Sequence, residues 1–172
     1  MQFEGVSLRR GLIVIGKGGS IGNASKQAYF SVGPSGTIVF RGNAMFSKGT
    51  TVRADTGTIV FGKNFWCNSD CVFQCTERIE FGDDCLLGWN IGVRDGDGHH
   101  ITTNGAPSTS KPIEVGNHVW VAADVTLLKG AYIPSESVVA SNSVVTKRFE
   151  GEHILVGGYP AKLLRKGVEW RL

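Results

Sequence analysis

Apolar residues recur every six positions along most of this chain. The repeat is most regular in the C-terminal half, where its members are Val115, Val121, Leu127, Ile133, Val139 and Val145. Small or β-branched residues follow four positions after the first five, at Val119, Val125, Ala131, Ser137 and Ser143. An α-helix would space its apolar residues by three and four, and a half-buried strand would space them by two. A period of six fits neither and indicates a repeat architecture.

The same period occurs upstream in shorter sets that restart after about three repeats. The sets are Phe40, Phe46 and Val52; Phe61, Cys67 and Phe73; and Phe81, Leu87 and Val93, with Ile15 and Ile21 as a degenerate beginning. A triangular coil produces this pattern, because each hexad supplies one side and one corner. We therefore predict an all-β fold, a left-handed parallel β-helix whose stacked coils bury like residues over like. An antiparallel sandwich would instead show alternation and hairpin turns.

Two segments interrupt the period and set the expected organisation. Residues 94–112 contain no hexad and are rich in Gly, Ser, Thr and Asn, so we predict a loop that leaves the prism. We expect the β-helix to span residues 1–149 and residues 150–172 to cap its open end, with a short helical turn within 160–170. Glycines after inward residues suggest corners with positive φ, at Gly62, Gly82, Gly88 and Gly116.

Charge and cysteine content limit the possible partners. The chain carries 18 Lys and Arg against 15 Asp and Glu, a balance that does not favour nucleic acid. Membrane spans need about 18 consecutive apolar residues, and no such run or signal-peptide pattern is present, so we expect a cytoplasmic protein. No C-x-x-C pair or histidine at ligand spacing supports a disulfide or metal site. The four cysteines are therefore expected inside the core: Cys67, Cys71, Cys75 and Cys85.

The segments IEVGNHVWVAADVTLLKGAYIPSESVVASNSVVTK and GGYPAKLLRK, together with DGDGHHI in the loop, resemble hexapeptide-repeat acyltransferases. The similarity is greatest to galactoside and maltose O-acetyltransferases and to surface-polysaccharide O-acetyltransferases, and it covers about residues 36 to 168. This resemblance implies a homotrimer with active sites in the clefts between neighbouring prisms. It also implies acetyl-CoA as donor and a histidine as general base.

His99 is the candidate base, because it follows Asp-Gly-Asp-Gly where the family motif has Asp-x-Asp-x-His. Imidazole can remove the proton of an attacking hydroxyl at neutral pH. His100 departs from the family pattern, and it either contacts the acceptor or has no role. Asp95 and Asp97 either orient the ring or meet the acceptor, or they are turn formers. His118 and His153 are interpreted as structural or exposed.

Asn68 follows an inward residue in KNFWCN, and the coil count places it on the same edge as Gly88, Ala122 and Ala140. In the sugar acetyltransferases that the chain resembles, an asparagine in this place contacts the acceptor. The alternative is a corner asparagine with left-handed geometry. An acidic residue that those enzymes use on the same coil is replaced here by Cys75 or Thr76, which puts the sugar specificity in doubt.

Small residues at two corners one coil apart predict a groove for the pantetheine arm of coenzyme A: Ala122, Ala123, Ala140 and Ser141. The backbone amide of Ala123 is a candidate oxyanion donor, because a fixed amide needs no reorganisation. Trp120 beside it either shapes the thiol end or packs in the core or trimer. The cofactor phosphates are expected to meet basic residues that are otherwise a solvated surface: Lys147, Lys162, Arg165 and Lys166. Tyr159-Pro160-Ala161 resembles the family's adenine-contacting turn.

Together these patterns predict an acetyl-CoA-dependent O-acetyltransferase that acts on a hydroxyl of a sugar or polysaccharide precursor. An amino-sugar nitrogen or an antibiotic hydroxyl is the alternative acceptor, and the acyl group is acetyl or longer. A non-catalytic β-helix scaffold subunit is the alternative from another class. A γ-class carbonic anhydrase uses three histidines on zinc, but this chain lacks the H-x4-H pair, so no metal is expected.

Overall fold

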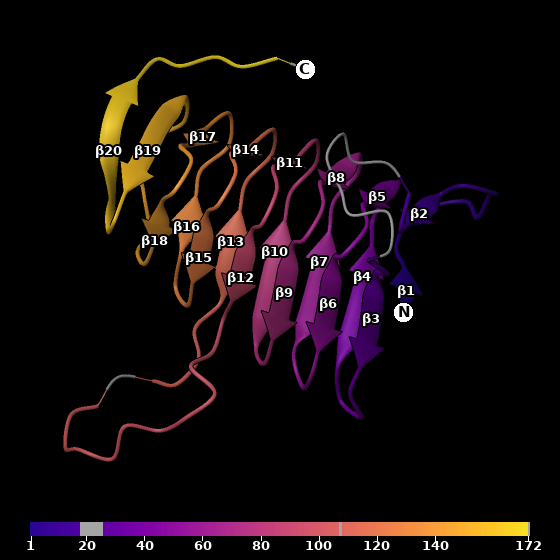
Figure 1. Ribbon diagram of the computed structural model, residues 1–172, viewed down its shortest axis with the longest axis horizontal. Coiled ribbons are helices and arrows are strands. Elements are labelled where there is room, and N and C mark those ends of the chain that lie inside the picture. Colours follow the sequence, from indigo (N-terminus) through magenta and orange to yellow (C-terminus); the bar gives the residue numbers. More distant parts are fainter. Residues whose placement is uncertain (18–25, 107, 172) are drawn as a thin grey trace.

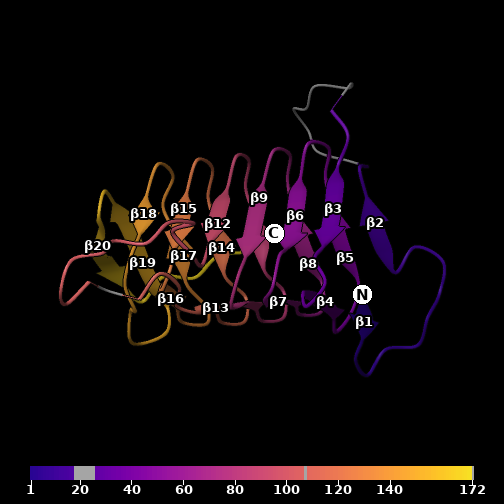
Figure 2. The same cartoon turned by 90° about the horizontal axis from the view of Figure 1, so that it is seen from below.

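The computed structural model describes residues 1–17, 26–106 and 108–171, and these residues form twenty strands and no helix. Three sheets of stacked short strands make the sides of a left-handed parallel β-helix (Figures 1 and 2). The prediction of a β-helix from the six-residue period is therefore confirmed. Ile21, which was assigned to the degenerate first repeat, lies outside the described residues.

Each coil contributes one strand to each sheet, and the strands of one sheet pair in parallel. Sheet A contains, in spatial order, β1 (Gln2–Phe3), β4 (Thr37–Phe40), β7 (Thr58–Phe61), β10 (Arg78–Phe81), β13 (Ile113–Val115) and β16 (Tyr132–Ile133). Sheet B contains β2 (Ile13–Ile15), β5 (Ala44–Phe46), β8 (Phe65–Cys67), β11 (Leu86–Leu87), β14 (Trp120–Val121), β17 (Val138–Val139), β19 (Ile154–Gly158) and β20 (Ala161–Lys166). Sheet C contains β3 (Tyr29–Val32), β6 (Thr51–Ala54), β9 (Val72–Cys75), β12 (Gly92–Arg94), β15 (Thr126–Leu128) and β18 (Val144–Val145).

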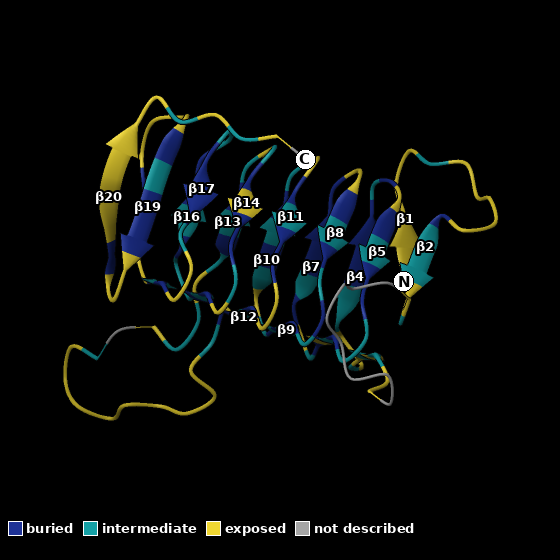
Figure 3. Cartoon of the chain, turned by 45° about the horizontal axis from the view of Figure 1, so that its top comes forward, coloured by how far each residue is buried: buried dark blue, intermediate teal, exposed yellow. Residues whose placement is uncertain are grey.

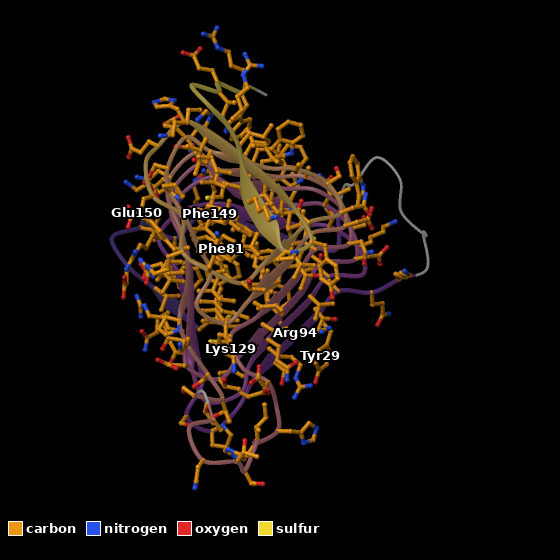
Figure 4. The ribbon with its side chains drawn as sticks, turned by 90° about the vertical axis from the view of Figure 1, so that its left-hand side faces the viewer. Tyr29, Phe81, Arg94, Lys129, Phe149 and Glu150 are labelled. Atoms are coloured by element: carbon orange, nitrogen blue, oxygen red, sulfur yellow. The ribbon has the colours of Figure 1, made fainter. Side chains whose placement is uncertain are left out.

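The inward residues form columns along the axis, as the period predicts. Phe40, Phe61 and Phe81 stack in one column, with ring centroids 5.6 Å and 6.0 Å apart. Phe81 and Phe149 lie inside the coil when it is viewed end-on (Figure 4). Burial of a phenylalanine side chain contributes roughly 1.5 to 3 kcal/mol, so a continuous column stabilises every coil through its neighbours.

The four cysteines are free thiols in this core, as expected from the sequence. Cys67, Cys71 and Cys75 are fully buried and Cys85 is 1% exposed. Burial raises the pKa of Cys85 to about 12 and also raises the pKa of the Cys67 and Cys75 thiols. These side chains therefore pack as small apolar groups.

The prediction that the corner glycines are needed for a positive φ is wrong. Gly62, Gly82, Gly88 and Gly116 do not have positive φ. The left-handed positions lie two residues later in the same corners, for example at Asn64 (φ 55). Glycine is needed because adjacent coils approach closely: a Cβ at Gly62 would lie 2.2 Å from the carbonyl oxygen of Gly82.

The C-terminal segment differs from the predicted helical turn. Strand β19 extends sheet B beside β17, and β20 turns back to pair with it in antiparallel fashion. Ile154 and Val156 alternate inward and close the core together with Phe149. A strand is favoured here because β17 leaves unpaired backbone groups at the open edge of sheet B. The boundary between β-helix and cap at residue 149 remains a prediction.

Candidate active site

The predicted loop leaves the prism at the edge between sheets C and A (Figure 1). Its first residue is Asp95 and not Arg94, because Arg94 still pairs with Leu128 and Gln74 in sheet C. The two arms of the loop form a narrow neck through the bridge between Gly96 and Ser110. Two further bonds close this neck, from Asp97 N to Thr109 O (2.9 Å) and from Lys111 N to Asp95 O (3.0 Å).

Asp95 anchors this neck to the coil below it. The side chain is fully buried, and its two carboxylate oxygens accept backbone N–H bonds from Thr76 (2.8 Å), Glu77 (2.8 Å) and Arg78 (2.7 Å). The Thr76 hydroxyl adds a bond of 3.0 Å and the Cys75 thiol one of 3.3 Å. Because these donors occupy the carboxylate, Asp95 cannot orient the ring of His99, and that alternative is wrong.

His99 and His100 lie on the exposed part of the loop beyond the neck. Asp97 pairs with the ammonium group of Lys129, and its contact with the acceptor stays a prediction. Lys129 also donates to the carbonyl oxygen of Ser108 at 2.7 Å, and Figure 4 shows it directed toward the loop. The structure therefore presents an exposed imidazole on a loop whose base is fixed and whose aspartates are already engaged.

The predicted cofactor groove lies on a different edge, between sheets B and C. Leu87 pairs with Cys67 and Val121, and Val121 pairs with Val139, so the residues after them fall in line: Asn68, Gly88, Ala122 and Ala140. Asn68 is not the left-handed residue of its corner, because that conformation falls on Asp70 (φ 65). Its Nδ2 donates to Leu87 O at 3.2 Å, which fixes the amide.

The Ala123 amide has an N–H group that is available to an oxyanion, because no described residue accepts a hydrogen bond from it. Its neighbours Ala122 and Asp124 donate to Val139 O and Trp89 O at 2.9 Å, but the Ala123 N–H donates to none of the described residues. A Cβ at Gly88 would lie 2.8 Å from this nitrogen. Glycine at position 88 therefore keeps the space beside the amide open, a role that its sequence position alone does not reveal.

A hollow of about 210 Å³ adjoins this edge, and we call it the tryptophan hollow. It is lined by Asn68, Leu86, Trp89, Trp120, Trp170 and Arg171. Trp120 is 38% exposed, so the alternative that it packs in the core is wrong. The sequence prediction missed Trp89, Trp170 and Arg171. Trp89 could have been found, because it stands one coil before Ala123, but nothing in the pattern predicts that the tail returns here.

A second hollow, of about 390 Å³, lies at the base of the loop, and we call it the basic hollow. Its charged lining residues are Lys111, Glu114, Lys129, Lys147 and Arg148. Three of its lysines stand 18 residues apart, the length of one regular coil, and therefore come to the same edge of the prism. Arg148 is already paired with Glu114 at 3.0 Å, so the hollow keeps an excess of positive charge.

The remaining predicted cofactor residues lie on the hairpin and are exposed: Pro160, Lys162, Arg165 and Lys166. Gly158 N donates to Ser143 Oγ at 3.0 Å, which holds the tip of the hairpin beside the corner of Ala140 and Ser141. Pro160 is therefore at the end of the groove. Lys162 and Arg165 pair with Gly157 and Leu155 along sheet B, away from Lys147 at the loop edge.

His118 and His153 have structural positions, as the sequence suggested. Both occupy left-handed corners, with φ 51 and φ 55. His118 Nδ1 lies 2.6 Å from Glu136 Oε2, and His153 is exposed. In the part of the chain that the structure describes, no group of three His, Cys, Asp or Glu side chains is placed to hold a metal ion. The described residues include no helix that could span a membrane.

Two curated relatives from Escherichia coli (strain K12) are similar in sequence. The chain is 28% identical to galactoside O-acetyltransferase over 110 residues, which are 63% of this chain and 54% of that protein. It is 29% identical to a putative lipopolysaccharide biosynthesis O-acetyl transferase over 145 residues, 76% of this chain and 72% of that protein. The chain spans about half the length of the first curated relatives that it matches. No protein-family model matches the chain.

Solved structures share the β-helix. A hexapeptide-repeat-containing acetyltransferase from Vibrio cholerae aligns with a TM-score of 0.55 at 25% identity, over 84% of this chain and 74% of that one. The chain is homologous to the hexapeptide-repeat acetyltransferases. A GDP-perosamine N-acetyl transferase from Caulobacter crescentus, solved with CoA and GDP-perosamine, has the same fold, with a TM-score of 0.60 at 19% identity over 80% of this chain and 54% of that one.

These homologues confirm the resemblance that the VWVAA and NSVVTK segments indicated. The structure separates the predicted site residues into two groups on different edges of the prism. His99 and Lys147 stand at the edge between sheets C and A, whereas Asn68, Trp120 and Ala123 stand at or beside the edge between sheets B and C. A single chain therefore does not bring the proposed base and the proposed oxyanion donor together.

Proposed function

We propose that the protein is an acetyl-CoA-dependent O-acetyltransferase that transfers an acetyl group to a hydroxyl of a sugar or polysaccharide precursor. The observation that carries this proposal is the Ala123 amide, which donates to none of the described residues and lies in a small-residue groove, on a chain whose homologues include sugar and polysaccharide O-acetyltransferases. The proposal includes a location in the cytoplasm, where acetyl-CoA is made available.

The active site is assigned to the cleft between two neighbouring copies in a homotrimer. This assignment is supported by the positions of the histidine loop and the groove, which lie on different edges of one prism. Cyclic symmetry places one edge of each copy against another edge of its neighbour. The loop of one chain would then reach the Ala123 groove of the next, and the complete site would contain residues from both.

The chain's own residues account for each step of a direct transfer. His99 takes the proton from the acceptor hydroxyl as its oxygen attacks the thioester carbonyl carbon. The Ala123 N–H stabilises the negative charge on the former carbonyl oxygen. The carbon–sulfur bond then breaks, the ester forms, and the protonated imidazole returns its proton to the departing thiolate.

Binding of coenzyme A is assigned to the groove of one chain and the basic hollow of the next chain in the trimer, because these two features lie on different edges of a single prism. The narrow pantetheine arm fits beside Ala122, Ala140 and Ser141, where side chains are small. Lys147 and its neighbours Lys111 and Lys129 supply positive charge for phosphate groups. Pro160 stands at the end of the groove for the adenine, and Lys162 and Arg165 are exposed nearby on β20. No metal has a role in this mechanism.

The test is a thiol-release assay with acetyl-CoA against sugars, nucleotide sugars, amino sugars and polysaccharides. Wild-type protein should release thiol with a hydroxyl acceptor, and His99→Ala should lose about 10² to 10⁴-fold in turnover while it still binds CoA. His153→Ala is the matched control, because that histidine is exposed and lies in the C-terminal segment. Full activity of His99→Ala would refute the base, and wild-type protein that does not bind CoA would favour the scaffold alternative.

A further inference from the structure

The C-terminal tail returns along the outer face of sheet B (Figures 1 and 3). After β20, Val168 N donates to His153 O at 2.9 Å. The indole of Trp170 then stacks on the His118 ring, with centroids 4.2 Å apart and planes at 12°. Trp170 Nε1 donates to His118 O at 2.9 Å. The tail is thus held in place by specific contacts and does not simply trail from the hairpin.

This tail completes the tryptophan hollow. The Trp170 ring is 6.2 Å from that of Trp120, and Trp89 and Trp120 remain 36% and 38% exposed. Three indoles around one hollow give it largely apolar walls, with few polar groups to fix the orientation of a ligand. This combination is typical of small-ligand sites. Pyranose rings present faces of C–H groups that pack well on indole rings.

Two polar groups of the hollow have unused capacity. Asn68 donates through Nδ2 to Leu87 O, but its Oδ1 accepts no hydrogen bond from the described residues. Arg171 is exposed and forms no ion pair within the described part of the chain. The amide oxygen can therefore accept from a ligand hydroxyl, and the guanidinium group can bind a carboxylate or phosphate through two parallel bonds.

The hollow also has the right position for an acceptor. Trp89 lies one coil before Ala123, since its carbonyl oxygen accepts from Asp124 N at 2.9 Å. A ligand in the hollow therefore lies beside the free Ala123 amide, where the thioester carbonyl is proposed to bind. Its hydroxyl would face the reacting carbon from the N-terminal side of the groove.

We propose that the tryptophan hollow binds the acceptor, that this acceptor is an anionic saccharide, and that Trp170 and Arg171 determine the specificity for it. The inference rests on the proposed function and adds a substrate class to it. The sugar ring packs on the indoles, Asn68 Oδ1 accepts from a hydroxyl, and Arg171 pairs with the anionic group. The anion is either a carboxylate of an acidic sugar or a phosphate of a nucleotide sugar.

Calorimetry on the full chain saturated with CoA tests this inference with three probes: trigalacturonic acid, UDP-galactose and neutral galactotriose. We expect one anionic probe to bind more tightly than galactotriose, and the stronger of the two identifies carboxylate or phosphate. Trp170→Ala should weaken that binding about tenfold, and Trp170→Phe should retain most of it because a ring remains. Arg171→Gln should remove the preference for the anionic probe.

Arg10→Gln is the charge-matched control, because it removes one exposed positive charge just before β2, and β5 and β8 separate β2 from the strands β11 and β14 of the hollow. It should leave the binding of all three probes unchanged, and every variant should keep the CoA affinity of the wild type. The inference is wrong if neither anionic probe binds better than galactotriose, or if Trp170→Ala and Arg171→Gln bind the probes as the wild type does. If the inference fails but acetyl transfer is still lost in His99→Ala, the proposed function stands. If the wild-type protein does not bind CoA, the proposed function and this inference are both refuted.

Discussion

The carboxylate of Asp95 accepts a hydrogen bond from the backbone amide of Arg78 at 2.7 Å, across the junction of two coils. The same carboxylate also binds the amides of Thr76 and Glu77, and its side chain is fully buried. A carboxylate at the root of a loop is thus used to attach that loop to the helix. The histidine beyond it owes its position to this attachment.

Asp95→Asn should destabilise the fold and loosen the loop. The amide offers one acceptor oxygen in place of two and places N–H groups against the backbone donors, and an unsatisfied buried polar group costs about 1 to 3 kcal/mol. Denaturant unfolding would measure this loss, and hydrogen exchange of residues 96–110 would measure the mobility of the loop. Asp97→Asn is the control, because Asp97 is exposed and pairs with the side chain of Lys129, so its substitution leaves no buried backbone donor without an acceptor. Equal stability of the Asp95→Asn variant and the wild type would contradict this role.

Gly62→Ala should cost more stability than Gly92→Ala. The new Cβ would lie 2.2 Å from the Gly82 carbonyl oxygen, and two coils would have to separate. Such overpacking costs about 1 to 3 kcal/mol. At Gly92 the nearest atom to a new Cβ is Thr126 Oγ1 at 3.7 Å, so Gly92→Ala is the matched control. The denaturation midpoints of the two variants are compared, and the midpoint of Gly62→Ala should be the lower one. Similar midpoints for the two variants would refute the close approach of the coils.

The four cysteines should resist thiol reagents while the protein is folded. Burial raises the pKa of Cys85 to about 12, and the pKa of Cys67 and Cys75 is raised as well, so very little reactive thiolate exists at pH 8. We expect Ellman's reagent to titrate no thiol in the native protein and four in denaturant. Because the thiol pKa is higher in the folded state than in the unfolded state, the folded protein keeps its full stability at a pH below the thiol pKa of the unfolded chain. The free energy of unfolding then decreases as the pH rises from that value toward the thiol pKa of the folded protein. Rapid reaction of a native thiol would show that the core is open.

The fold was predictable because its signal is periodic. Each side of a coil repeats the same environment, so inward residues such as Phe61, Cys67 and Phe73 recur six positions apart. The C-terminal segment was predicted less well because it contains no repeat. Whether Pro160 to Trp170 forms a helical turn or a strand depends on the edge of β19, with which β20 pairs, and the local sequence does not reveal that edge.

The candidate site was predictable in part for the same reason. The alignment of Asn68 with Ala122 and Ala140 follows from counting coils, and the structure places them in that order. The burial of Asp95 and the pairing of Asp97 with Lys129 depend on how the loop neck closes, and no spacing encodes it. Trp170 joins the hollow through a contact with His118, 52 residues away in the sequence.

The central claim is that the loop of one chain and the groove of another form each active site. Two inactive variants test it: His99→Ala in the loop, and Ser141→Trp, which fills the groove at an exposed corner. The thiol-release activity of oligomers assembled from a 1:1 mixture is measured against that of each variant alone. Random assembly of trimers should restore about one quarter of the wild-type activity, because that share of the interfaces receives an intact loop and an intact groove. Mixed oligomers that stay as inactive as either variant alone would contradict the claim.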